Sequence, residues 1–204
     1  MNHFLRTIID NPRNTHYMLD VETNGLESTR NSMTSLCMVQ FIPGKEIIYN
    51  RKLHVRTTSL PGRIVDAPTM KWRKENNVDE MELDLPRHNS IKILQVIRDY
   101  IKAGGGNPHI YALHKDFDIT YVNSYFEYRH AEKPWHYRNI FDIEDVILGM
   151  GYNRREITAF VLKTPKWKDT CKRFFNGNIA AHDAFYDCLL QIEIFAAAIK
   201  AKGI

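Results

Sequence analysis

The chain has 204 residues, of which 44% are hydrophobic and 11% aromatic, and its formal net charge is +4. This supplies one substantial hydrophobic core, so we expect a single domain covering residues 1–204. No apolar run approaches the roughly 20 residues of a membrane-spanning helix, and Met1 to Asn14 lacks the apolar stretch of a signal peptide, so membrane and secreted classes are disfavoured. The small net charge allows a polyanionic ligand without requiring one.

Three strand-like runs open the predicted order of elements. They cover His16 to Val21, Ser35 to Ile42 and Glu46 to Leu53. Turns containing Asn24-Gly25 and Pro43-Gly44 join them. Short strands joined by such turns indicate an antiparallel meander.

Helices and strands then alternate along the chain. Apolar residues recur at helical spacing from Ser90 to Ala103, and a strand follows at Ile110 to Leu113. A helix is predicted from Asp118 to about His130, a strand from Asn139 to Asp142, and a last helix from about Asp183 to Lys202. Three strands followed by such units predict an α/β fold, a mixed five-stranded sheet flanked by helices.

Asp20 and Glu22 stand at the end of the first apolar run, in the segment LDVETNGL. Residues i and i+2 of a strand point to the same side, and two such carboxylates raise each other's pKa unless a cation neutralises them. The pair therefore indicates a divalent metal site. The plainer alternative is that both acids end a strand in water, with a turn after them.

Two later segments supply further acids and a histidine. His182 and Asp187 lie five residues apart at the start of the last predicted helix. Asp118 follows the strand that ends near Leu113, directly after Phe117. Asp116 is the main rival to Asp118, and we interpret it as a turn or helix-cap residue. An isolated histidine before a helix is usually structural, but the accompanying acids favour a functional His182.

Together these motifs resemble those of the DEDDh exonucleases, a family of the ribonuclease-H-like superfamily. The second motif of that family, N-x-x-F-D, aligns with Asp118 and places His114 where an asparagine is common. Asp183 stands where the tyrosine subclass needs its tyrosine, so the histidine subclass is favoured. The exonuclease A type of T-even phages is the most similar, through Thr69 to Trp72 and His182 to Cys188.

The resemblance implies a two-metal site with assigned ligands. Asp20 would bridge two ions, Glu22 and Asp187 would complete the site that generates the nucleophile, and Asp118 would hold the second ion. His182 would be the general base. Hard carboxylate ligands favour two Mg²⁺ or Mn²⁺ ions over zinc. Cys37, Cys171 and Cys188 suggest neither a structural zinc site nor a disulfide framework.

Substrate contacts are also implied by the resemblance, at the turn formed by Thr23, Asn24, Gly25 and Leu26. The alternative for these residues is a turn and nothing more. Trp72 is flanked by Lys71, Arg73 and Lys74, a composition that suits stacking on a base near a phosphate. A half-buried helix residue is an equal alternative for Trp72.

A second basic and aromatic stretch contains Arg154, Arg155 and the segment Lys163 to Lys172 with Trp167. We interpret this stretch as a solvated face.

The predicted function is metal-dependent 3′-to-5′ exonuclease activity on single-stranded ends, releasing nucleoside 5′-monophosphates. DNA is favoured over RNA by a small margin. The alternatives are an exoribonuclease or oligoribonuclease with the same site, because nothing here visibly recognises a 2′-hydroxyl, and a nucleic-acid-binding module without turnover. The expected location is the cytoplasm of a bacterium or of a phage-infected host cell. No membrane partner is expected, and a homodimer is compatible with this class.

Overall fold

A mixed sheet is the centre of the fold. The computed structural model describes residues 2–45, 47–78, 84–177 and 181–204. Within these ranges, six strands form one sheet in the order β4-β3-β2-β1-β5-β6. The strands are β1 (Asn14–Thr23), β2 (Met33–Phe41), β3 (Ile47–Thr57), β4 (Arg87–His88), β5 (Asn107–Ala112) and β6 (Ile140–Asp142).

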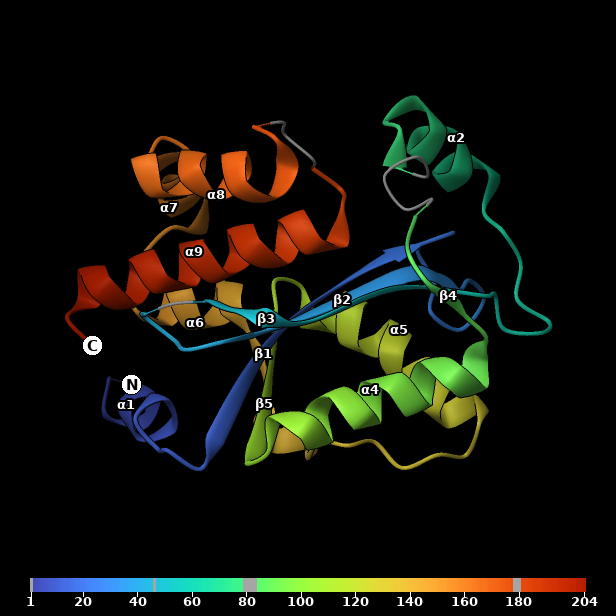
Figure 1. Ribbon diagram of the computed structural model, residues 1–204, viewed down its shortest axis with the longest axis horizontal. Helices are drawn as coiled ribbons and strands as arrows, with labels where there is room; N and C mark the ends of the chain where they lie inside the picture. The colour runs from blue at the N-terminus through green and yellow to red at the C-terminus, as the bar shows by residue number, and fades with distance from the viewer. Residues whose placement is uncertain (1, 46, 79–83, 178–180) are drawn as a thin grey trace.

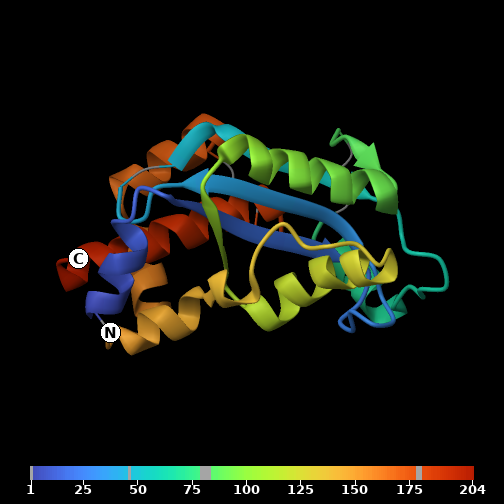
Figure 2. The ribbon, with the colours of Figure 1, turned by 90° about the horizontal axis from the view of Figure 1, so that it is seen from below.

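Helices cover both faces of this sheet (Figures 1 and 2). The face with α4 and α5 contains one hydrophobic cluster, and the face with α9 contains a second cluster, to which α1, α6, α7 and α8 contribute. The helices are α1 (Asn2–Ile9), α2 (Ala67–Glu75), α4 (Ser90–Gly104), α5 (Lys115–Tyr128), α6 (Ile143–Gly149), α7 (Arg154–Val161), α8 (Pro165–Phe175) and α9 (Ala184–Lys202), with a 3₁₀ turn at Tyr137–Asn139. In the described ranges, no helix combines the length and apolar character needed to cross a membrane.

The predicted α/β class and the mixed sheet are confirmed, and the strand count differs by one. The antiparallel meander β1-β2-β3 is present, while β5 pairs with β1 and β6 pairs with β5 in parallel. The additional strand, β4, pairs Arg87 and His88 with Arg56 and Thr57. Two residues are too few to show a period in the sequence, so this strand depends on tertiary contacts alone. Of the predicted third strand, Glu46 lies outside the described residues.

Strand β1 divides its side chains between the two faces of the sheet. Tyr17, Leu19 and Val21 pack in the cluster with α4 and α5, whereas Met18 packs against α9. Because side chains alternate along a strand, Asp20 and Glu22 lie on the same face as Met18. The hydrogen bond from the side chain of Gln191 in α9 to Asp20 agrees with this placement.

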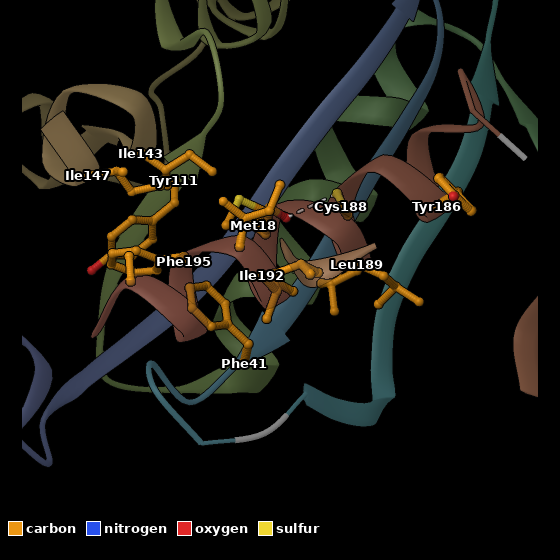
Figure 3. Packing of buried hydrophobic residues seen from close by; sticks show 14 of the residues in the cluster. Met18, Phe41, Tyr111, Ile143, Ile147, Tyr186, Cys188, Leu189, Ile192 and Phe195 are labelled. Carbon is orange, nitrogen blue, oxygen red and sulfur yellow. Dashed lines mark hydrogen bonds between the residues drawn. The ribbon is translucent and has the colours of Figure 1, made fainter. Parts of the chain in front are cut away.

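Helix α9 is held over this face by close apolar packing. Figure 3 shows Leu189, Ile192 and Phe195 of α9 in one buried cluster with Met18 and Phe41 of the sheet. The Cys188 thiol lies 3.6 Å from the main-chain oxygens of both Met18 and Cys37, so it can donate to either. Burial of this kind is the dominant favourable term in folding, so the position of α9 is set by the core.

An irregularity marks the end of β1 beside the two acids. The pairing of β1 with β2 shifts register between Glu22 and Thr23, because Thr23 pairs with Met33 while Glu22 pairs with Ser35. Thr34 is therefore the additional residue on β2. Bulges bend a strand and redirect its side chains, and they are frequent beside active sites.

Candidate active site

The two carboxylates of β1 are contacted from different helices. The Gln191 Nε2 of α9 donates to Asp20 Oδ1 at 2.8 Å. Arg73 of α2 places its Nη1 3.2 Å from Glu22 Oε2, and the Glu22 side chain is 12% exposed. Each acid thus has a partner that fixes one of its oxygens, as a metal ligand requires.

Asp118 joins these acids from α5. This helix begins at Lys115, three residues before the predicted start, where the Lys115 N–H donates to Asp142 Oδ2 at 3.0 Å. Asp118 is 5% exposed and accepts a hydrogen bond from the Val21 N–H at 3.2 Å. The side chain of Asp116 is 96% exposed and lies 3.7 Å from the Lys115 ammonium. The structure brings Asp118, and not Asp116, to the end of β1.

His182 and Asp187 are joined by a hydrogen bond across the start of α9. Asp183 is the N-cap of this helix, and its side chain accepts from the N–H groups of Phe185 and Tyr186. The His182 N–H donates to Asp187 Oδ2 at 3.0 Å. His182 has a φ of 69°, in the left-handed region that a residue with a Cβ rarely adopts. Such strain is concentrated at functional sites, where surrounding contacts hold it.

Burial and mutual repulsion raise the pKa of three carboxyls in this site. The pKa of Asp20 lies well above its ordinary value, first because of burial and then because of the charges of Asp118, Asp187 and Glu22. Burial raises the pKa of Asp118 to about 7 and that of Asp187 to about 7. Crowded acids of this kind are stabilised in their charged form by a cation.

The donor atoms fit a hard divalent ion. Ligand atoms of Glu22, His182 and Asp187 all lie within 4.8 Å of one another. Asp20 and Asp118 line the same cavity. Carboxylate oxygens with room for water are the ligands that Mg²⁺ and Mn²⁺ prefer, so the acids present are suited to such a group.

A cavity of about 690 Å³ opens over these acids. Helix α2 contributes Trp72, helix α5 contributes Phe117, and helix α9 contributes Leu190 and Ile194. The cavity therefore combines apolar walls with a cluster of carboxylates, and this combination is typical of binding sites for small molecules or for the ends of polymers.

The turn after β1 contributes to the cavity only in part. Thr23 and Leu26 line it, and Leu26 is 73% exposed. Asn24 does not line the cavity, because its side chain accepts from the Ser32 N–H at 2.7 Å and is buried.

Gly25 does not line the cavity either. A Cβ at this position would lie 2.1 Å from the Asn31 side chain. Gly25 is therefore needed for packing within the turn. The substrate contacts expected for Asn24 and Gly25 stay a prediction, and neither residue is among those that line the cavity.

Trp72 has features of both alternatives given for it, a residue that stacks on a base and a half-buried helix residue. Its side chain lines the cavity, and the residue is 41% exposed. Its ring also meets the His182 ring edge to face, with 4.6 Å between centroids. Trp72 is thus positioned to contact a ligand and to limit the movement of His182.

Three residues at the site were missed or misread in the sequence. Arg73, expected beside a phosphate, is 1% exposed and contacts Glu22. Arg154, expected on a solvated face, lines the cavity and donates from Nε to Glu144 Oε1 at 3.1 Å. Gln191 was not singled out, although a buried amide one turn after Asp187 on an apolar helix is a detectable signal.

Trp167 also differs from the solvated face predicted for its segment. It is 3% exposed and packs edge to face against Tyr186, with 5.2 Å between ring centroids. Helix α8 is amphipathic, so its lysines are exposed on one face while Trp167 is buried on the other.

Several solved structures share the fold. Cell-death related nuclease 4 aligns with a TM-score of 0.64 and 13% identity, over 93% of this chain and 66% of that one. Exonuclease I of E. coli in complex with a dT13 oligonucleotide aligns with a TM-score of 0.63 and 13% identity, over 93% of this chain and 41% of that one. Exonuclease I of Methylocaldum szegediense aligns with a TM-score of 0.61 and 14% identity, over 91% of this chain and 40% of that one.

The chain thus spans about two fifths of the length of the exonuclease I chains. A search of curated proteins gave no match. The family model described as the 3′-5′ exoribonuclease Rv2179c-like domain matches residues 15–199, which contain all five predicted catalytic residues. The more specific resemblance to the exonuclease A type remains a prediction. The chain belongs to the family of Rv2179c-like 3′-5′ exoribonuclease domains.

Proposed function

We propose that this chain is a two-metal 3′-to-5′ exonuclease that removes nucleoside 5′-monophosphates from single-stranded nucleic acid. The observation that supports this most is the grouping of Glu22, His182 and Asp187 within 4.8 Å, beside Asp20 and Asp118, in one cavity. The two divalent ions are Mg²⁺ or Mn²⁺ in this proposal. Asp20, Glu22, Asp118 and Asp187 hold them.

Hydrolysis of a phosphodiester requires a nucleophile at neutral pH and stabilisation of the leaving oxygen, and a pair of divalent ions supplies both. In this proposal His182 accepts the proton of the attacking water. Burial lowers the pKa of His182 from its ordinary value, which keeps the imidazole in the neutral form that a base needs. The hydrogen bond from the main-chain N–H of His182 to Asp187 holds the backbone, and the contact with Trp72 limits the movement of the ring.

The substrate contacts follow from the walls of the cavity. Leu26 and Trp72 present apolar surface at its rim, where the last base of a strand can stack. The preference for DNA stays a prediction. Exoribonuclease activity is the second candidate, and the description of the family favours it.

Matched 5′-labelled DNA and RNA oligomers test this proposal. We expect shortening from the 3′ end with Mg²⁺ or Mn²⁺, release of nucleoside 5′-monophosphates, and no cleavage with a chelator. Asp20→Ala and Asp187→Asn should abolish turnover without unfolding the protein. Asp116→Asn is the matched control and should retain activity, because its carboxyl is exposed away from the site. A folded Asp20→Ala or Asp187→Asn protein with most of its activity would contradict the proposal.

A further inference from the structure

Arg73 differs from its basic neighbours on α2 in being buried. Its side chain is 1% exposed, whereas the side chain of Lys71 is 78% exposed. An arginine is almost never fully buried unless it is paired. The burial of Arg73 should therefore be explained by the groups that it contacts.

Two contacts of Arg73 lie at the proposed metal site. Arg73 Nη1 donates to Glu22 Oε2 at 3.2 Å and to the main-chain oxygen of Thr23 at 3.3 Å. One guanidinium nitrogen thus ties the side chain of Glu22 to the backbone that follows it. Both contacts lie at the bulge between Glu22 and Thr23, where regular pairing with β2 is interrupted.

The chemistry of the guanidinium suits this position. A planar guanidinium holds a carboxylate in a fixed orientation, which a flexible ammonium does not do equally well. It also places one positive charge among the carboxylates of Asp20, Glu22, Asp118 and Asp187, whose mutual repulsion is evident in the raised pKa of Asp20. A bond from outside the ligand set that orients a ligand is a common feature of metal sites.

We propose that Arg73 is a positioning residue, which holds Glu22 so that a carboxylate oxygen stays within reach of the ligand atoms of His182 and Asp187. This inference rests on the proposed function, because it takes Glu22 as a metal ligand. The competing explanation is purely structural: Arg73 fastens α2 to the sheet, and its loss acts through general loosening of the helix.

A double-mutant cycle separates the two explanations. Arg73→Gln and Arg73→Lys are made in the wild-type and in the Glu22→Gln background, with Lys74→Gln as the control, since Lys74 is an exposed neighbour on the same helix. Mn²⁺ affinity is measured by calorimetry on metal-free protein, and kcat, KM and Tm are measured in parallel.

We expect Arg73→Gln to lower Mn²⁺ affinity or kcat by about 10- to 100-fold, with KM for the oligomer changed by less than about threefold. Arg73→Lys should recover part of the loss. In the Glu22→Gln background the same substitution should have almost no further effect on Mn²⁺ affinity, because the group it positions is already altered. Lys74→Gln should match the wild type in Mn²⁺ affinity and Tm.

Three outcomes would overturn the inference. The first is an equal loss of Mn²⁺ affinity on Arg73→Gln in the wild-type and Glu22→Gln backgrounds. The second is tighter Mn²⁺ binding by Arg73→Gln, and the third is an Arg73→Gln protein with the Mn²⁺ affinity and kcat of the Lys74→Gln control. If Arg73→Gln does not fold, the same cycle is completed with Arg73→Lys, which retains the charge. A folded Glu22→Gln protein with wild-type activity would instead contradict the proposed function, so the two failures are distinguishable.

Discussion

The two sides of the active site are held by different forces. Helix α9, which carries Asp187, is buried at intervals from Ala184 to Ile199 and packs across the sheet. Helix α2, which carries Trp72, buries Arg73 alone among its nine residues. Core packing therefore fixes the α9 side, whereas on the α2 side the buried residue is a charged one that bonds to β1. Of the acids that need fixed geometry, Asp187 lies on α9, Asp20 and Glu22 lie on the sheet, and Asp118 lies on α5. The aromatic residue proposed to meet the substrate lies on the lightly attached side.

His182 stands at the junction of the two sides, and its removal should have the largest effect. We expect His182→Ala to reduce the rate of cleavage by roughly 10²- to 10⁴-fold, because His182 is the residue proposed to take the proton of the attacking water. Mn²⁺ affinity should stay within a few-fold of the wild type, since the carboxylates hold the ions. His136→Ala, at an exposed histidine, is the control. Cleavage within a few-fold of the wild type by a folded variant would show that His182 is structural.

The five proposed catalytic residues could be singled out in the sequence because each belongs to a local pattern. Asp20 and Glu22 stand two residues apart in one strand, and His182 and Asp187 are separated by little more than one helical turn. The structure places all of these side chains, with Asp118, at one cavity. Their roles remain predictions.

The supporting contacts could not be predicted in the same way. The contact between Arg73 and Glu22 joins residues 51 positions apart, and that between Gln191 and Asp20 joins residues 171 apart. Nothing local in the sequence distinguishes Arg73 from the solvated Lys71. The strand β4 and the buried Trp167 were missed for the same reason, because only the folded chain brings their partners together.

Truncation of the core beneath α9 tests whether packing fixes that side. Leu189 is fully buried, so Leu189→Ala should lower the free energy of unfolding by about 2 to 5 kcal/mol. Met70→Ala on α2 is the matched comparison, and it should cost about 1 kcal/mol or less because Met70 is only partly buried. Urea unfolding measures both. Equal losses for the two variants would remove the contrast between the sides.

Acid should remove a stabilising contribution of the buried His16, which packs against Phe41 and Tyr111 on the α9 face of the sheet. Burial, and then the charge of His109, lower the pKa of His16 from 6.5 to about 4. The unfolded chain therefore binds more protons than the folded chain between these values. The contribution of His16 to the free energy of unfolding should fall by about 3 kcal/mol in all as the pH falls from about 6.5 to about 4. His16→Gln should flatten this part of the profile, and His3→Gln, at an exposed histidine, should not. An unchanged profile for His16→Gln would contradict the assignment.

The smallest effect is expected at Trp72, on the lightly attached side. Trp72→Ala should weaken binding of a single-stranded oligomer by about 1 to 3 kcal/mol if its ring stacks on a base. Binding is measured in an Asp187→Asn background, which prevents cleavage, and Trp72→Phe should retain part of the affinity. A lowered Tm with unchanged affinity would support the alternative that Trp72 is a packing residue.

The left-handed backbone at His182 also has a consequence for how the protein can be used. Glycine adopts this conformation without the penalty that a Cβ incurs. His182→Gly should therefore lose the base and yet fold more stably than His182→Ala. Activity and stability are opposed at this position. A glycine variant would accordingly be the better reagent for trapping an intact strand on the enzyme for structure determination.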